Sequence, residues 1–275
     1  MKTLGVEKMN HFNNIKVVHG ITTRLGGVSE GVFGAMNTSF FGVDDKMAVF
    51  ENIKLALNTI GSDAKTIVAT QQVHSNKILV IDAQTPFSEL RKIDVSGSAL
   101  EGYDLFVSPE TDGLITNRRD VVLMTFYADC VPLMLHDPET GYVGTVHSGW
   151  RGTANLIGGD AIAILKAKGS DVNHIKAGIG HCAGLCCYEV DQPVVDAFLQ
   201  HFTTLEMAEF VRPKGAFKFM LDLKRANAIV FKRCGIRESN IEINQDCTIC
   251  NAHMYHSHRR TGYPRGTMSA FIQIK

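Results

Sequence analysis

Three residues that could bind a metal ion or form a reactive centre stand in loops or at the ends of predicted strands: His74, Cys130 and His147. None of their spacings is a local metal-binding motif, so only the fold could bring them together. Two imidazoles and one thiolate suit Zn²⁺ with a fourth position open to water or substrate, as in catalytic sites, and the same set suits copper. The simpler alternative is a buried thiol at Cys130 and a structural histidine at His147 that hydrogen-bonds the next turn.

Two charged residues adjoin this trio in the sequence. Asp129 precedes Cys130, so a carboxylate is available as a general acid or base, or as a hydrogen-bond partner of a metal ligand. His147 is followed by Ser-Gly-Trp-Arg-Gly and a predicted helix, whose free amides together with Arg151 would suit a phosphate or another anion. From the residues alone, a surface salt bridge explains Arg151 more simply.

The segment 22–37, TTRLGGVSEGVFGAMN, is rich in glycine without matching a nucleotide-binding motif. It is neither G-x-G-x-x-G after a strand nor a P-loop. Arg24 and Asn37 are its polar residues that could reach a ligand. An ordered surface loop is an equally good interpretation of the pattern.

Two cysteine clusters compete with the trio as metal sites: HCAGLCC at 181–187 and CTICNAHMYHSH at 247–258. Cys247 and Cys250 have C-x-x-C spacing, and three histidines follow them. A lone C-x-x-C is weak evidence, however, and no second pair stands at zinc-ribbon distance. Redox use is disfavoured as well, because the motif does not open a helix in a thioredoxin-like βαβ unit.

Strands and helices alternate along the chain in a way that indicates a mixed α/β fold. The apolar runs in the middle of the chain are unbroken, which is typical of strands covered on both faces and hence of a sheet between two layers. Gly61 predicts the end of the first helix. The expected strands are 15–23, 66–70, 77–82, 121–128, 131–137, 142–147, 174–180 and 267–274, and the expected helices are 45–61, 153–169, 192–202 and 222–235.

Composition excludes several classes of function. The 275 residues carry no formal net charge, so bulk attraction to nucleic acid or to an anionic membrane is not expected. No secretory signal and no run of eighteen apolar residues is visible. We therefore expect a cytoplasmic protein with neither nucleic acid nor membrane as a partner.

The motifs, taken together and in order, resemble one family along nearly the whole chain. This is the YfiH/YlmD family, also called the laccase-domain or multicopper polyphenol oxidase family and a purine nucleoside phosphorylase family, with mammalian FAMIN as a relative. The matching segments are ITTRLGGVSEGVFGAMN, QQVHS, TDGLIT, YADCVPLML, GTVHSGWRGTAN, CCYEV, LDLKRAN and CTICN…HSHRR.

The resemblance implies one domain over residues 1–275, folded as a layered α-β-β-α sandwich with mixed sheets. It implies a metal site, zinc or alternatively copper, whose ligands match His74, Cys130 and His147. The implied activity is phosphorolysis of adenosine, inosine and S-methyl-5'-thioadenosine to the free base and the (methylthio)ribose 1-phosphate, with adenosine deaminase activity alongside. Purine nucleosides and phosphate are then the partners, and a homodimer is expected.

With this resemblance, Asp129 and Cys130 become the candidate catalytic residues, and Asp129 would move protons. The candidate substrate-binding residues are Arg24, Asn37, Arg151 and Arg259. The chain departs from the family pattern at Gly180-His181-Cys182, at Tyr255-His256 and in the segment GYPRGT, and these departures bear on the substrate pocket rather than on the metal ligands.

Three rival functions stay open at this point. A copper-dependent polyphenol oxidase would need more copper ligands than a single His-Cys-His set supplies. A metal-free hydrolase or deamidase would use Cys130 as nucleophile and His147 as base, without His74. A non-enzymatic role through a protein partner would not need Cys130.

Overall fold

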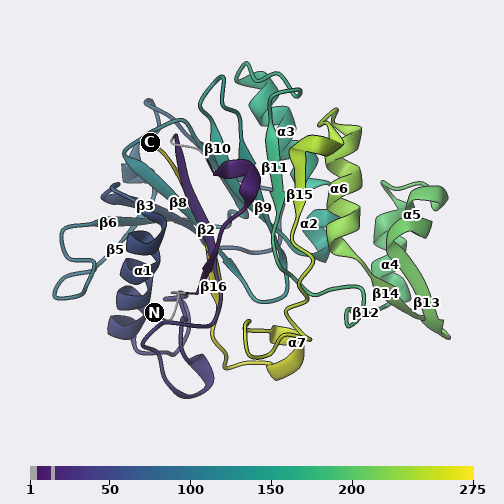
Figure 1. Cartoon of the computed structure of the whole chain (residues 1–275), viewed down its shortest axis with the longest axis horizontal. Helices are drawn as coiled ribbons and strands as arrows, with labels where there is room; N and C mark the ends of the chain where they lie inside the picture. Colours follow the sequence, from purple (N-terminus) through teal and green to yellow (C-terminus); the bar gives the residue numbers. More distant parts are fainter. Residues whose placement is uncertain (1–4, 14–15) are drawn as a thin grey trace.

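Two β-sheets lie face to face, and helices cover the outer face of each (Figure 1). The computed structural model describes residues 5–13 and 16–275. Helix α1 (Lys46–Ile60) packs on the first sheet, and helices α3 (Ile157–Ala167) and α6 (Leu223–Arg233) pack on the second. This arrangement confirms the predicted α-β-β-α sandwich, whereas the boundary of the domain at residues 1–275 stays a prediction.

The first sheet has seven strands and mixes parallel with antiparallel pairs. The C-terminal strand lies inside this sheet, antiparallel to both of its neighbours. In order across the sheet, the strands are β1 (Val6–Glu7), β2 (Val17–Thr22), β16 (Met268–Ile274), β8 (Val121–Tyr127), β3 (Thr66–Thr70), β6 (Asp104–Ser108) and β5 (Arg91–Ile93).

The second sheet has six strands and is also mixed. Its central strands are antiparallel, and its two edges are parallel pairs. In order, the strands are β15 (Ile241–Ile243), β11 (Lys176–Ile179), β9 (Val131–His136), β10 (Val143–Ser148), β7 (Gly113–Thr116) and β4 (Ile78–Ile81).

A small antiparallel sheet and several short helices complete the fold at one side (Figure 1). The sheet consists of β12 (Glu189–Asp191), β14 (Lys218–Leu221) and β13 (Val211–Gly215). The remaining α-helices are α2 (Trp150–Ala154), α4 (Gln192–Leu199), α5 (Thr204–Phe210) and α7 (His258–Thr261), and the 3-10 turns are η1 (Asn10–Phe12), η2 (Gly31–Phe33), η3 (Phe87–Glu89) and η4 (Glu238–Asn240).

Each interface between layers has its own apolar core. Ile53 and Leu57 of α1 pack over the first sheet, Leu123 and Met134 meet between the two sheets, and Phe231 of α6 packs over the second sheet. Burial of each such side chain contributes about 1.5–3 kcal/mol. Every residue of β8, β9 and β10 is buried, which confirms the interpretation of the unbroken apolar runs as strands between layers.

The first helix agrees with its prediction at both ends. The Asp45 side chain accepts a hydrogen bond from the Met47 amide and so caps the free N-terminal amides of α1. Gly61 ends the helix in the left-handed conformation with φ of 78°. The expected strand 15–23 corresponds to β2, but its first residue, Ile15, lies outside the described residues.

The single helix expected over residues 153–169 is wrong. The segment forms α2 and α3, separated at Leu156, whose φ is 63°. The Asn76 side chain donates a hydrogen bond to the Asn155 carbonyl at the break. Gly152 lets the two short helices pack closely, since a Cβ there would lie 3.2 Å from Ile157. Helical periodicity alone could not reveal this break.

None of the helices within residues 5–13 and 16–275 combines the length and hydrophobicity of a membrane span.

His136, at the end of β9, is buried, and neither of its ring nitrogens has a hydrogen-bond partner among the described residues. Burial lowers the pKa of His136 to about 4, with Lys16 acting in the same direction and Asp137 against it. This pKa is below that of the same histidine in the unfolded chain, so protonation of His136 does not lower the free energy of unfolding above about pH 6.5. The free energy of unfolding falls as the pH is lowered from there toward about 4, because the unfolded chain binds the proton more readily than the folded one.

We therefore expect His136→Leu to flatten the loss of stability on acidification. Between about pH 7.5 and pH 5, the free energy of unfolding of the variant should fall by about 2 kcal/mol less than that of the wild type. Urea unfolding at both pH values measures the difference, and His201→Leu, at an exposed histidine, is the control. Parallel pH dependences of His136→Leu and wild type would contradict the prediction.

Candidate metal centre and substrate cavity

Three turns of the sandwich bring His74, Cys130 and His147 together. His74 comes from the loop between β3 and β4, Cys130 from the turn between β8 and β9, and His147 from the end of β10. Their candidate ligand atoms all lie within 4.8 Å of one another, with Cys130 Sγ 3.8 Å from His74 Nε2. A tetrahedral zinc ion sets nitrogen–sulfur separations of about 3.6 Å, so the trio can hold such an ion with small adjustments.

Asp112, immediately before β7, fixes two members of this trio. It is fully buried, and its Oδ1 lies 2.8 Å from His147 Nδ1. The same carboxylate accepts hydrogen bonds from the backbone amides of Val73, His74 and Ser75. A carboxylate on the far nitrogen of a histidine fixes the tautomer and aims the other nitrogen at the metal. Asp112 therefore orients His147 and shapes the His74 loop at once.

Electrostatics favour an ionised thiolate at Cys130. Removal of Cys130 from water opposes its ionisation, but His147 and His74 more than offset this and lower the pKa of the thiol to about 6. Burial likewise opposes a charge on His147, whereas the Cys130 thiolate and Asp112 raise the pKa of His147 to about 9. The two pKa shifts have opposite directions, because a thiolate at Cys130 and a protonated ring at His147 stabilise each other.

The backbone of Gly149 lies so close to the trio that a side chain at this position would clash with it. A Cβ at Gly149 would lie 2.8 Å from the His74 ring and 3.1 Å from Cys130 Sγ. Gly149 is also the N-cap residue of helix α2, in the Ser-Gly-Trp-Arg-Gly segment. His74 and Asp129 have φ values of 62° and 91°, in the left-handed region that non-glycine residues rarely adopt. Such strain gathers at functional sites.

Asp129 is buried next to Cys130, and its carboxylate is held by neighbouring segments. Its carboxylate accepts hydrogen bonds from Thr248 Oγ1 at 2.6 Å, Ser257 Oγ at 3.0 Å and the Arg259 amide at 2.6 Å. Oδ2 accepts two of these bonds and Oδ1 one, so the carboxylate has little acceptor capacity left for a substrate proton. Its predicted catalytic role stays untested, and its contacts in this structure anchor α7 beside Cys130.

A cavity of about 670 Å³ opens beside the trio, within the range of small-molecule sites. Arg265 supplies a half-buried cation to its wall, and its guanidinium is held by His258 Nδ1 and Thr267 Oγ1. Phe41 and Phe126, in edge-to-face contact, supply an aromatic wall. The lining residues are Ser39, Phe41, Gln71, Gln72, His74, Phe126, Tyr127, Ala128, Cys130, His147, His258, Arg265 and Thr267.

None of the four predicted substrate-binding residues lies among those lining this cavity. The Arg24 guanidinium donates to the carbonyls of Gly34 and Ala252, and so ties two loops together.

Arg151 is exposed and stacks over Trp150. Arg259 stacks over Tyr188 and lines a separate hollow.

Asn37 is buried and bonds Asp44 and the amide of Thr267. Thr267 lines the cavity, so Asn37 is connected to the cavity wall only through its hydrogen bond with Thr267. The roles of all four residues in substrate binding stay predictions.

Sequence reasoning missed Asp112 and Arg265. Asp112 stands in TDGLIT, a segment that matches the family pattern but does not by itself assign a role to the carboxylate. Arg265 stands in GYPRGT, a departure from the family pattern that bears on the substrate pocket. The signal for Asp112 is an acid directly before a buried strand. No local pattern distinguishes Arg265 from the neighbouring arginines.

We expect Asp112→Asn to weaken metal binding, because an amide cannot act as an anionic acceptor for His147 and the loop amides together. Loss of such an outer partner typically lowers metal affinity by about 10–100-fold. Competition with a fluorescent zinc chelator measures the affinity, and Asp120→Asn, at an exposed aspartate paired with Arg118, is the control. Equal zinc affinities of Asp112→Asn and wild type would contradict the role given to Asp112.

Known proteins share this fold and most of this chain. The model of the family described as multi-copper polyphenol oxidoreductase laccase matches residues 18–275. The chain is 31% identical over 264 residues to purine nucleoside phosphorylase YlmD of Bacillus subtilis (strain 168), with 96% of this chain and 90% of that protein covered. It is also 31% identical over 264 residues to adenosine deaminase RL5 from an unknown prokaryotic organism, with 95% of each covered.

A solved structure agrees with the sequence comparisons. The crystal structure of the Bacillus licheniformis hypothetical protein YfiH superposes with a TM-score of 0.86 and 29% identity, covering 100% of this chain and 98% of that one. The resemblance seen in the motifs is therefore confirmed over the fold as well as the sequence. The chain belongs to the multi-copper polyphenol oxidoreductase laccase family, the family of the YlmD and YfiH proteins.

Proposed function

We propose that the protein is a metal-dependent purine nucleoside enzyme. It cleaves adenosine, inosine and S-methyl-5'-thioadenosine with phosphate, and it also deaminates adenosine to inosine. The observation that carries this proposal is the His74–Cys130–His147 trio, which lies in the wall of a cavity that also holds a cation and two aromatic rings. The names of the relatives, a purine nucleoside phosphorylase and an adenosine deaminase, support it.

Zinc is the metal that we assign to the trio. Two histidines and one cysteine make a three-ligand set of the kind that catalytic zinc sites use, and Asp112 provides the outer carboxylate that such histidines have. When bound there, zinc supplies Lewis-acid catalysis next to the cavity. Its identity rests on the donor atoms alone.

Phosphorolysis requires the chain to hold an anion against the ribose. Phosphate attacks C1', the bond from C1' to the purine nitrogen breaks, and the base leaves with a proton. Arg265 is the cation in the cavity wall, and its guanidinium is already fixed by His258 and Thr267. A fixed, half-buried guanidinium binds phosphate with little ordering cost. Phe41 and Phe126 can stack on the purine at the aromatic wall.

The product test uses purified protein, adenosine and phosphate, with chromatography of the mixture. Adenine with ribose 1-phosphate is expected from phosphorolysis and inosine from deamination. His74→Ala should lose both metal and both activities, since it removes a ligand, while His253→Ala, at an exposed histidine, is the control. A wild-type protein that holds metal at the trio and yields neither product would refute the proposed function.

Substitution of Arg265 separates phosphate binding from the rest of the reaction. Arg265→Ala should raise the KM for phosphate by about 10-fold or more, because a charge-assisted hydrogen bond contributes about 1.5–3 kcal/mol. The KM for the nucleoside should change less, and Arg237→Ala, at an exposed arginine bonded to Asn173, is the control. Arg24→Ala and Arg151→Ala belong in the same series. If Arg24→Ala or Arg151→Ala raises the KM for phosphate more than Arg265→Ala does, phosphate binds at that arginine, as expected from the sequence, and not at Arg265.

One observation favours a second candidate, a metal-free hydrolase or deamidase. The lowered pKa of Cys130 and the raised pKa of His147 describe a nucleophile paired with its acid–base partner. In such an enzyme His74→Ala would keep most of its activity.

Polyphenol oxidation is less well supported, because the other candidate metal cluster in the described part of the chain consists of cysteines alone. A cytoplasmic location and a homodimer remain predictions.

A further inference from the structure

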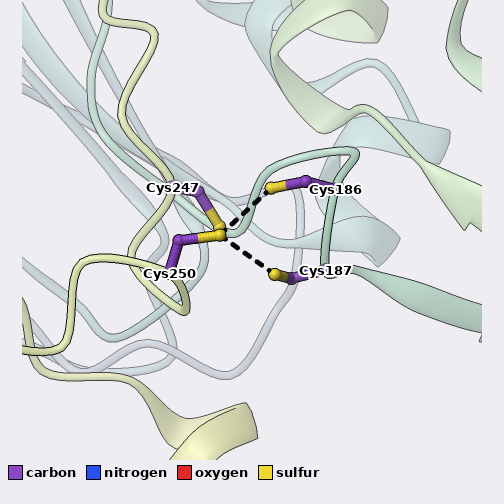
Figure 2. A group of neighbouring side chains, drawn as sticks. All are labelled: Cys186, Cys187, Cys247 and Cys250. Atoms are coloured by element: carbon purple, nitrogen blue, oxygen red, sulfur yellow. Dashed lines mark hydrogen bonds between the residues drawn. The ribbon is translucent and has the colours of Figure 1, made fainter.

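Four cysteines outside the trio meet at one point on the surface (Figure 2). Cys186 and Cys187 lie in the turn before β12, and Cys247 and Cys250 lie in the loop after β15. The four sulfur atoms all lie within 4.8 Å of one another, and Cys250 Sγ is 3.4 Å from Cys186 Sγ and 3.2 Å from Cys187 Sγ. Two segments that are distant in sequence thus present four thiols to a common centre.

We propose that Cys186, Cys187, Cys247 and Cys250 bind a structural zinc ion. A tetrahedral ion bonded at about 2.3 Å to each sulfur sets sulfur–sulfur separations of about 3.8 Å. The separations of Cys250 Sγ from Cys186 Sγ and Cys187 Sγ, 3.4 and 3.2 Å, are slightly shorter than this, so a small expansion of the cluster accommodates the ion. Four protein ligands leave no open position, which distinguishes this site from the three-ligand set at the trio.

The backbone around Cys247 is arranged as a thiolate site requires. The Gly184 amide donates to Cys247 Sγ at 3.2 Å, and the amides of Ile249 and Cys250 donate to the same sulfur. Hydrogen bonds from amides stabilise a thiolate over a thiol. A Cβ at Gly184 would lie 3.0 Å from Cys247 Cβ, so glycine permits the two segments to approach.

Nearby cations favour negative charge in the same place. The Arg260 guanidinium donates to the carbonyls of Thr248 and Ile249, within the Cys247–Cys250 loop. The Lys224 ammonium donates to the Asp246 carbonyl just before that loop. Four thiolates around a divalent ion leave a net negative charge, which these two side chains partly balance.

The cluster joins the two segments that hold Asp129 beside the trio. On one side, the Ala183 amide donates to the Asp129 carbonyl at 2.9 Å; on the other, Thr248 Oγ1 donates to the Asp129 carboxylate at 2.6 Å. The Thr248 amide also bonds the Cys182 carbonyl. A metal ion at the cluster would therefore link the two segments that hydrogen-bond Asp129 and so stabilise the turn that carries Cys130. It would not contact the cavity.

Binding involves no redox step. Each coordinating thiol loses its proton to solvent as its sulfur bonds the ion, so affinity falls as the pH is lowered. The cluster is accessible for this exchange, because Cys186 and Cys250 are exposed.

The test is the zinc content of the purified full chain after dialysis against metal-free buffer, with and without substitutions. We expect about two ions per chain in the wild type and about one in Cys250→Ser. His74→Ala, which alters only the trio, should keep the ion at the cluster. Cys234→Ser, at a half-buried cysteine in the C-terminal cap of α6, is the matched control and should retain the wild-type content.

Cobalt substitution identifies the ligands independently of activity. In His74→Ala, cobalt should give the intense thiolate-to-metal charge-transfer absorption of a four-sulfur site, and this absorption should be lost in Cys250→Ser. If Cys250→Ser does not fold, Cys186→Ser and Cys187→Ser replace it, and far-ultraviolet circular dichroism verifies that each variant is folded. A strong chelator should lower the Tm of His74→Ala, which holds an ion at the cluster alone, but not that of the double variant His74→Ala/Cys250→Ser.

Two results would overturn the inference. One is a single ion that His74→Ala loses and Cys250→Ser keeps, which would leave the proposed function intact. The other is a purified chain whose cluster contains a disulfide and no metal, seen as lost thiol titre and a mass lower by two hydrogens. A single ion that Cys250→Ser loses and His74→Ala keeps would support the cluster and refute zinc at the trio.

Discussion

The buried carboxylate of Asp112 is the constraint on which the site depends. A charge taken out of water is costly unless it is paired and hydrogen-bonded, and Asp112 meets this condition through His147 and the amides of the His74 loop. These partners, together with Ser75, hold the pKa of Asp112 at about 2 against its burial. Because one buried carboxylate bonds both the His74 loop and His147 of β10, it fixes the position of the loop relative to that strand.

The packing of the two sheets supplies the rest of the geometry. Thr125 of β8 and Thr145 of β10 share a hydrogen bond across the sandwich, and the Tyr127 hydroxyl donates to the carbonyl of Val146. These polar contacts lie in an otherwise apolar interface and fix how far one sheet can slide over the other. Since Cys130 follows β8 and His147 ends β10, the same contacts determine the distance between them.

The sequence was sufficient for the features that depend on local chemistry. It predicted the capped helix α1 and the buried central strands, because caps and unbroken apolar runs are visible locally. The trio was a hypothesis from ligand types and family resemblance, and only the fold brings its residues together. It missed the small third sheet, since β13 is polar and exposed at most of its positions. The pairing of Cys186 with Cys250, 64 positions away, is a property of the fold that no spacing rule describes.

The position of β16 has a consequence for how the chain acquires its structure. This strand follows all the other strands and helices of the described chain, yet it lies between β2 and β8 inside the first sheet. Until residues 268–274 leave the ribosome, β2 and β8 present open, apolar edges of the kind that aggregate. Strands β9, β10, β7 and β4 of the second sheet can pair before β16 is made, but neither β15 of that sheet nor the first sheet can be in place early. The nascent chain therefore exposes these two edges for most of its synthesis, although each belongs to the interior of the finished sheet.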